Sequence, residues 1–299
     1  MSRGVTLCFA PQVRPPYVWR LRRLPLAPYT LEGVSLGGQE TALAIPEWDI
    51  CFDVGRSPPF AVARGTVLVT HGHMDHAGGL AYHCALRSLL GLTPPTYVVP
   101  RENFDAFTDL FDVWRRLDRS PLPCTLVPLS PGETFPLGRD RHALAFRSPH
   151  RVPCQGYALV RARTRLLPEH DGKPEGVIRT LKLAGVPITE RSEIVEIAFC
   201  GDTTIDVVDR EAVVRQARHL LLEVTFLDDR VPVAKARSSG HVHLDEVVER
   251  ADLFENEQIV FTHFSQRYTH GEIHGIVRAR LPVGLADRVV VLCPEPERG

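Results

Sequence analysis

Long apolar runs are missing from this sequence, and their absence argues against the commonest kind of membrane protein. No run approaches the roughly 20 consecutive apolar residues that a membrane-spanning helix needs. A strong excess of charge of either sign is missing too, since 35 Lys and Arg residues balance 36 Asp and Glu residues. No global basic field therefore draws the chain onto nucleic acid, and any binding of a polyanion has to come from local patches.

Paired cysteines are also missing. The seven cysteines are odd in number and widely spread, and none forms a Cys-x-x-Cys pair. This pattern indicates neither a disulfide framework nor a zinc ribbon, and it fits a reducing, cytoplasmic location best. Lysine is nearly absent, so the positive charge is almost all arginine. Arginine binds phosphate in a bidentate manner, but we interpret its abundance here first as a compositional bias of the source genome.

The chain is long enough for one large α/β domain or two small ones, because its 299 residues are 44% hydrophobic and can supply a core. Residues 1–30 carry several arginines and no acid, which resembles a targeting peptide in composition. Prolines at positions 11, 15, 16, 25 and 28 break any amphipathic helix there. We therefore interpret residues 1–30 as an N-terminal extension.

One short stretch concentrates residues that can bind a metal. The apolar run at residues 66–69 is typical of a buried strand, and it is followed by His71, His73, Asp75 and His76. Neutral imidazole and carboxylate suit zinc, manganese or iron better than calcium. His71 and His73 can point to one ion, and a turn can aim Asp75 and His76 at a second. The alternative is a set of ordinary surface histidines ahead of a helix, which four such residues in six positions disfavour.

Other predicted strands end in the same residue types. The strand ends carry His150, Asp202, Glu223 and His263. In a layered α/β fold the strand ends along one edge form a single crevice, so we expect these side chains to converge with His71 and His73. Asp53, which also follows a strand, is expected either to orient a metal-bound histidine or to stabilise a turn.

The remaining pattern predicts the elements around this crevice. Apolar residues alternate with glycine turns over residues 31–56, which indicates an antiparallel meander. Helical spacing covers residues 80–92, 101–117 and 244–253. Residues 163–193 are polar and charged, and we expect them to form a surface arm or a helical insertion.

Three motifs resemble a known family. They are Thr70-His71-Gly72-His73-Met74-Asp75-His76-Ala77-Gly78-Gly79-Leu80, Cys200-Gly201-Asp202-Thr203-Thr204 and Thr262-His263-Phe264-Ser265-Gln266-Arg267-Tyr268. The first looks like the metallo-β-lactamase superfamily, and the third resembles the tRNase Z (ribonuclease Z) branch. Four further segments look like the short plant-type members: residues 37–41, 52–56, 225–229 and 240–243.

The resemblance implies a fold and a metal site. The fold would be the α/β, αββα four-layer sandwich, spanning residues 31–293 as a catalytic domain with residues 163–193 as an inserted arm. The site would hold two zinc ions, with manganese as an alternative metal. In this family's arrangement His71, His73 and His150 would bind the first ion, Asp75, His76 and His263 the second, and Asp202 both.

The resemblance also implies a reaction, which is endonucleolytic removal of the 3′ trailer of precursor tRNA. Asp75 would orient or deprotonate the attacking water, and Glu223 with His241 would form the proton-delivery pair. Homodimers are common in the family, and we expect one here.

Two features leave alternatives open. The chain has Leu222-Glu223-Val224-Thr225 where many members have His-Glu-Ala-Thr, and His241-Val242-His243 where they have His-Ser-Thr. The role of His243 is therefore open. Because residues 163–193 lack the glycine-proline-rich motif of the bacterial arm, a hydrolase of small or cyclic nucleotide diesters is the alternative function. A non-catalytic interaction subunit would have eroded metal ligands, and all seven are intact.

Overall fold

Two seven-stranded sheets form the centre of the molecule in the computed structural model, which describes residues 21–293. The first sheet contains, in spatial order, β1 (Arg22–Leu26), β2 (Tyr29–Leu36), β3 (Glu40–Ile45), β4 (Ile50–Phe52), β5 (Thr66–Leu68), β6 (Thr96–Pro100) and β7 (Thr125–Leu129). The second contains β14 (Val289–Val291), β13 (Gln258–Thr262), β12 (His219–Glu223), β11 (Thr189–Phe199), β10 (Gln155–Leu166), β9 (Arg141–Arg147) and β8 (Thr134–Pro136).

Both sheets mix antiparallel and parallel pairing. In the first, β1 to β4 are antiparallel, which confirms the predicted meander, and β4 to β7 are parallel. In the second, β11 to β14 are parallel, and β8 to β11 are antiparallel. Parallel strands need crossover connections, and helices supply them.

The expected domain boundary at residue 31 is too late. Strand β1 pairs with β2 from Arg22 opposite Gly33 to Leu26 opposite Tyr29, so the sheet begins inside the segment interpreted as an extension. The sequence did not predict this strand because it contains Pro25. Proline is tolerated in an edge strand but not in a central one, and β1 is the edge strand of the first sheet. Residues 1–20 of the expected extension lie outside the described part of the chain.

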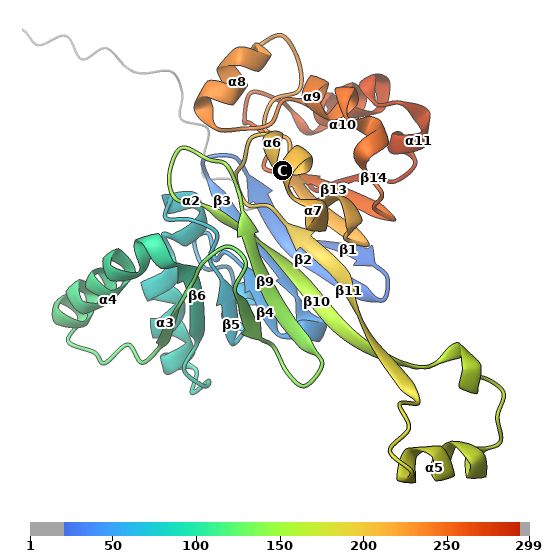
Figure 1. The fold of residues 1–299 in the computed structure, drawn as a ribbon. Coiled ribbons are helices and arrows are strands. Elements are labelled where there is room, and N and C mark those ends of the chain that lie inside the picture. The colour runs from blue at the N-terminus through green and yellow to red at the C-terminus, as the bar shows by residue number, and fades with distance from the viewer. Residues whose placement is uncertain (1–20, 294–299) are drawn as a thin grey trace, which may run out of the picture.

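Helices cover the outer faces of both sheets (Figure 1). The helices are α1 (Pro59–Val62), α2 (Met74–Ala77), α3 (Leu80–Leu89), α4 (Phe104–Asp118), α5 (Glu175–Leu183), α6 (Asp206–Arg210), α7 (Ala212–Gln216), α8 (Val233–Ser239), α9 (Leu244–Glu249), α10 (His270–Arg280) and α11 (Val283–Ala286), with 3-10 turns η1 (Pro46–Trp48), η2 (Arg101–Asn103), η3 (Pro168–His170) and η4 (Ala251–Leu253). The predicted helices at 80–92, 101–117 and 244–253 correspond to α3, to η2 with α4, and to α9 with η4.

Three hydrophobic layers explain the sandwich. Helices α1, α3 and α4 pack on the first sheet, and α6, α7, α9, α10 and α11 pack on the second. A third layer lies between the sheets and takes side chains from both. Strand β12 shows the alternation, because Leu221 faces the layer between the sheets whereas Leu220 and Leu222 face the helices. The predicted αββα sandwich is confirmed.

Strands β10 and β11 continue beyond the sheet as a hairpin arm, which runs to the lower right of Figure 1. They remain paired as far as Leu166 opposite Thr189, and η3 and α5 lie between their ends. The residues of the arm are mostly exposed. Residues 163–193 thus form both a surface arm and a short helix. None of the helices described between residues 21 and 293 has the length and apolar character needed to cross a membrane.

Candidate metal centre

The predicted ligands converge at one end of the two sheets. His71 and His73 lie in the loop after β5, and Asp75 and His76 lie on α2. His150, Asp202 and His263 follow β9, β11 and β13 in the other sheet. The geometry divides these seven residues into two groups that could each hold a metal ion. The fold therefore brings together all seven side chains that the sequence singled out as ligands.

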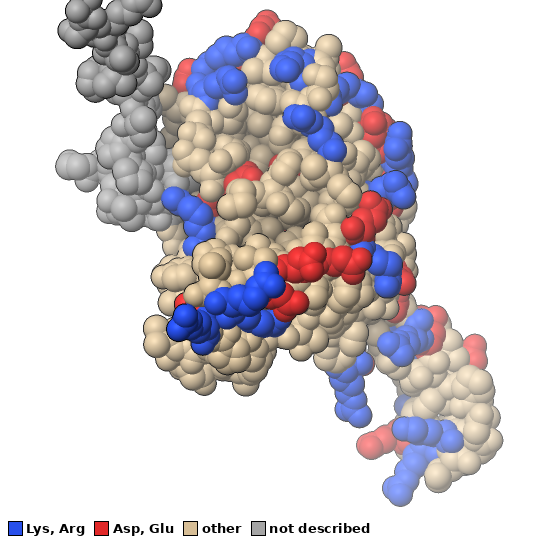
Figure 2. All heavy atoms as spheres, turned by 90° about the vertical axis from the view of Figure 1, so that its left-hand side faces the viewer, with Lys and Arg blue, Asp and Glu red and all other residues tan. Residues whose placement is uncertain are grey.

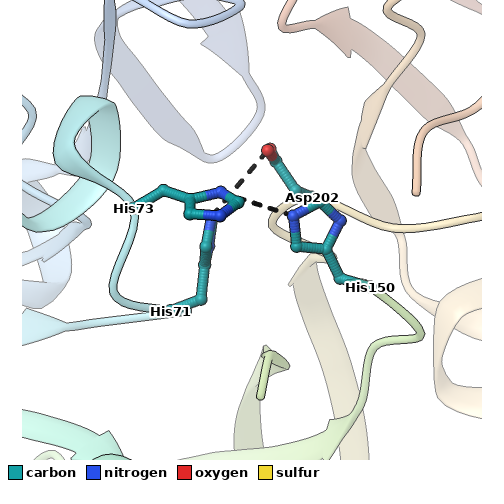
Figure 3. Close-up of side chains that lie close together, drawn as sticks. All are labelled: His71, His73, His150 and Asp202. Carbon is teal, nitrogen blue, oxygen red and sulfur yellow. Dashed lines mark hydrogen bonds and ion pairs between the residues drawn. The ribbon is translucent and has the colours of Figure 1, made fainter. Parts of the chain in front are cut away.

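The first group contains His71, His73, His150 and Asp202, each offering one ligand atom within 4.8 Å of the others. Figure 3 shows these side chains pointing toward one another, with His71 and His73 on one loop and His150 and Asp202 on two other segments. Nε2 of His150 lies 3.4 Å from Nδ1 of His73, and Nε2 of His71 lies 3.8 Å from Oδ2 of Asp202. Such spacing suits donors that share one ion.

The second group contains Asp75, His76 and His263. Nε2 of His76 lies 3.4 Å from Nε2 of His263, which in turn lies 3.4 Å from Oδ2 of Asp75. Asp202 lies between the groups, because its Oδ1 is 3.2 Å from Nε2 of His76 while its Oδ2 faces His71. One carboxylate can therefore contact an ion in each group.

A buried aspartate fixes the orientation of two of the histidines. Oδ2 of Asp53 lies 2.7 Å from Nδ1 of His76, so this ring nitrogen donates to the carboxylate and Nε2 is the ring nitrogen turned toward the site. The hydroxyl of Thr70 donates to the same oxygen, at 2.8 Å, and lies 3.0 Å from Nδ1 of His71. Because that hydroxyl proton is already used, His71 donates to Thr70, and its Nε2 is left facing the site. The Asp53 carboxylate thus bonds Thr70 and His76 and orients two candidate metal ligands, which agrees with the first of its two expected roles.

Two other histidines are oriented in the same way. Nδ1 of His150 donates to the carbonyl of Gly240 at 2.8 Å, and Nδ1 of His263 donates to the Thr225 hydroxyl at 3.0 Å. Gly240 has φ +83°, and a Cβ on it would lie 2.7 Å from Nδ1 of His150. Only glycine allows this close approach. Each ring again presents Nε2 to the centre.

A buried nitrogen without a hydrogen bond shows what kind of group the centre can bind. Nε2 of His71 is shielded from solvent and makes no hydrogen bond within the described part of the chain. Unpaired buried polar atoms are costly, and divalent cations accept both imidazole and carboxylate ligands. The residues present therefore fit a divalent transition metal of the zinc type.

Burial and charge set the protonation of these ligands. Burial lowers the pKa of His71 and of His150 below the usual histidine range, which keeps both rings neutral. Burial also opposes charge on His76, but Asp202 and Asp53 outweigh it and raise the pKa of His76 well above its usual value. Burial raises the pKa of Asp202, yet His263 and His76 more than compensate and lower it.

A second polar pair lies beside the ligands. Nδ1 of His241 lies 2.8 Å from Oε1 of Glu223, at the end of β12. Burial lowers the pKa of His241, but the Glu223 carboxylate outweighs this effect and raises that pKa to about 9. Glu223 also accepts hydrogen bonds from Thr203 N and from the Thr225 hydroxyl. The pair is thus fixed in place, with the histidine protonated at neutral pH.

Strained backbone accompanies the site. Asp53 has φ 53° and His263 has φ 59°, a left-handed conformation that residues other than glycine rarely adopt. The surrounding hydrogen bonds have to hold these residues in place, and such strain clusters at functional sites.

Some supporting groups were not predicted from the sequence. The Gly240 carbonyl and the Gly38 amide, which donates to Oδ2 of Asp75 at 2.9 Å, belong to segments far from their partners in the chain, whereas the Thr70 hydroxyl lies next to His71 in the sequence. His243 has a structural contact instead, because its Nδ1 accepts from Asp245 N and caps α9.

Comparisons with known proteins agree with this geometry. A family model described as a beta-lactamase superfamily domain matches residues 56–264. tRNase Z TRZ1 of Arabidopsis thaliana is 42% identical over 266 residues, which cover 88% of this chain and 95% of that protein. tRNase Z TRZ2, chloroplastic, of the same plant is 35% identical, covering 84% of this chain and 72% of its own length.

Solved structures share the fold. The metallo-beta-lactamase fold protein YhfI of Bacillus subtilis matches with a TM-score of 0.60 at 14% identity, covering 88% of this chain and 95% of its own. The short form of human tRNase Z matches with a TM-score of 0.54 at 21% identity, covering 79% and 92%. The sequence relatives extend the agreement from the fold to the family, and the chain belongs to the tRNase Z family of the β-lactamase superfamily.

Proposed function

We propose that this protein is a metal-dependent endoribonuclease that removes the 3′ trailer of precursor tRNA. The observation that carries this proposal is the pair of ligand groups joined by Asp202, in a chain that is 42% identical to a named tRNase Z over 88% of its length. The two ligand groups support the type of reaction. The relatives and the arm formed by residues 163–193 support the choice of precursor tRNA as substrate.

Two ions would occupy the two groups. His71, His73 and His150 would hold the first, Asp75, His76 and His263 the second, and Asp202 both. Family membership implies metal dependence, and the donors favour zinc, with manganese as the alternative. When bound, the metal supplies a Lewis acid that activates water and offsets the charge of the scissile phosphate.

The chain's own residues would handle the protons. The amide of Gly38 holds Oδ2 of Asp75 at 2.9 Å, and a hydrogen bond with His263 outweighs burial and lowers the pKa of Asp75. Asp75 thus remains an ionised acceptor that can orient or deprotonate the attacking water. His241 donates to Glu223 through Nδ1, so its Nε2 proton is available for the departing 3′-oxygen.

The arm offers a contact for a long substrate. Strand β11 rises about 3.3 Å per residue, so Thr189 lies roughly 30 Å from the end of the strand that leads to Asp202. A small diester cannot reach both places, whereas a folded RNA can. The exposed arginines Arg163, Arg165, Arg179 and Arg191 can bind backbone phosphates. Figure 2 shows basic and acidic side chains together on the arm, at the lower right.

A homodimer is also part of this proposal. Apolar side chains remain exposed on α3 and α4, including Leu89 at 80%, Leu117 at 68% and Trp114 at 45%. A monomer rarely leaves so many large apolar side chains in water on neighbouring elements. We expect a mass in solution of twice 33.4 kDa by light scattering, and Leu117→Glu to shift it toward the monomer.

A reducing compartment such as the cytoplasm fits the cysteines. The six described cysteines are all free, and four of them are buried. One relative, TRZ2 of Arabidopsis thaliana, is named chloroplastic, so fractionation of the source cells is the direct test.

Cleavage assays test the function. Zinc-loaded protein is incubated with a precursor tRNA bearing a 3′ trailer, alongside bis-p-nitrophenyl phosphate. We expect one cut at the 3′ end of the acceptor stem, leaving a 3′-hydroxyl. His73→Ala should abolish it, whereas His142→Ala, on β9 and outside both ligand groups, should not. Hydrolysis of the small diester with the tRNA left intact would support the small-diester alternative instead.

A further inference from the structure

Helix α10 and the chain segment after β14 bring together three further residues of metal-binding type. His270 and His274 lie one turn apart on the same face of α10, and Cys293 lies just beyond β14. One ligand atom from each lies within 4.8 Å of the others. None of the three belongs to the candidate centre, and the proposed reaction uses none of them.

The spacing suits a tetrahedral ion. Zinc bonds of about 2.0–2.3 Å place neighbouring donors about 3.3–3.8 Å apart. Sγ of Cys293 lies 3.5 Å from Nε2 of His274, and the two imidazole rings have centroids 4.6 Å apart. The centre shows the same spacing, 3.4 Å between nitrogens of His73 and His150. The cluster therefore needs little rearrangement to share an ion.

Burial supplies a second, independent observation. Nε2 of His270 is shielded from solvent and has no hydrogen-bond partner among residues 21–293. The side chain of Cys293 is also buried, at 1% exposure, whereas His274 is exposed. A shielded nitrogen without a partner is costly, and a bound ion would remove that cost. The exposed His274 leaves a path for the ion from solvent.

We propose that His270, His274 and Cys293 form a zinc site separate from the catalytic centre. The thiol of Cys293 loses its proton to solvent when the ion binds, and a water completes the coordination. A thiolate with two imidazoles and no carboxylate favours zinc over calcium or magnesium. The ion would join α10 to the end of β14, the three-residue edge strand of the second sheet. The site would thus stabilise that edge.

Cobalt substitution tests the site with a signal that the catalytic centre cannot give. A thiolate bound to Co²⁺ produces a charge-transfer absorption in the near ultraviolet, and the ligands of the centre are all nitrogen and oxygen atoms. We expect this band in the cobalt-loaded wild type and its loss in Cys293→Ser and His274→Ala. Cys124→Ser is the matched control, because Cys124 lies on the other sheet beside β7, and it should retain the band.

Metal analysis gives a second readout that does not depend on how many ions the catalytic centre holds. His274→Ala removes an exposed side chain, so we expect it to fold like the wild type and to hold one zinc equivalent fewer. Its thermal midpoint in zinc should also fall. Equal zinc content in the wild type and in His274→Ala would overturn the proposal. So would a cobalt band that persists in both Cys293→Ser and His274→Ala. Either result would mean that the three residues form only a hydrogen-bonded cluster.

Discussion

Strand β11 serves two regions that differ sharply in burial. Its last four residues are buried and lead to Asp202 in the centre, whereas its first five are exposed and belong to the arm. At the buried end, two hydrophobic layers surround the segment, and hydrogen bonds orient four of the candidate ligands: His71, His76, His150 and His263. At the exposed end, only the pairing with β10 shapes the chain. The burial difference fits the proposed roles, in which the buried end positions the reacting groups and the exposed arm contacts the RNA.

The largest effect is expected from removing the carboxylate between the ligand groups. Asp202→Ala should lower cleavage by about 10³-fold or more, because the metal supplies several kcal/mol of transition-state stabilisation. It should also lose at least one metal ion per chain, measured by mass spectrometry. Asp206→Ala, on the neighbouring α6, is the control. Full metal content with normal turnover would remove Asp202 from the site.

A smaller loss is expected from the proton-delivery pair. Glu223→Gln should lower kcat by about 10²-fold through loss of general-acid support, while the bound metal is retained. Glu257→Gln, which removes an exposed ion pair with Arg218, should leave kcat near wild type. If the Glu223 variant instead lost metal, that residue would belong to the ligand support and not to proton transfer.

The arm should affect binding without affecting chemistry. Its four exposed arginines are Arg163, Arg165, Arg179 and Arg191. Replacing all four by glutamine should weaken tRNA binding roughly tenfold. The slope of log Kd against log salt concentration should also become shallower, by about 0.9 for each phosphate contact that is lost. Hydrolysis of bis-p-nitrophenyl phosphate should stay unchanged. The matched control replaces Glu169, Glu175 and Glu190 of the arm by glutamine. An unaltered salt slope would refute the arm as an RNA contact.

The smallest effect is expected from an apolar residue of the arm. Leu183 is 81% exposed, so Leu183→Ala should change the free energy of unfolding by less than about 0.5 kcal/mol. Leu221 is fully buried between the sheets, and Leu221→Ala should cost about 2–5 kcal/mol. Chemical denaturation measures both. A large loss in the Leu183 variant would mean that the arm packs on another surface, such as a second subunit.

The sequence predicted best where a short segment determines its own structure. The strand at β12 and the loop from His71 to His76 were readable because alternation, apolar runs and ligand spacing are local. Strand β1 was missed because Pro25 is acceptable only at a sheet edge, and edges are set by the fold. Helix α10 was missed because its glycines lower its helix propensity, and packing of Ile273 and Val277 decides instead.

Contacts between distant segments could not be predicted. The Gly240 carbonyl reaches His150 across 90 positions of the chain, and Cys293 reaches His274 only because α10 and β14 belong to the same layered half of the fold. Nothing in either local sequence marks these contacts. The ligands of the centre were predictable as residue types, whereas the groups that orient them required the fold.

Shortening the arm tests the division between chemistry and substrate contact most directly. Ala162 and Glu193 are paired, so a two-residue Asn-Gly turn can join them and remove residues 163–192, which include the four exposed arginines. The measurement is kcat/KM for precursor tRNA and for bis-p-nitrophenyl phosphate, in wild type and in the shortened protein. We predict a fall of at least about tenfold for tRNA and no change for the small diester. An equal fall for both substrates, or no fall for tRNA, would contradict this account.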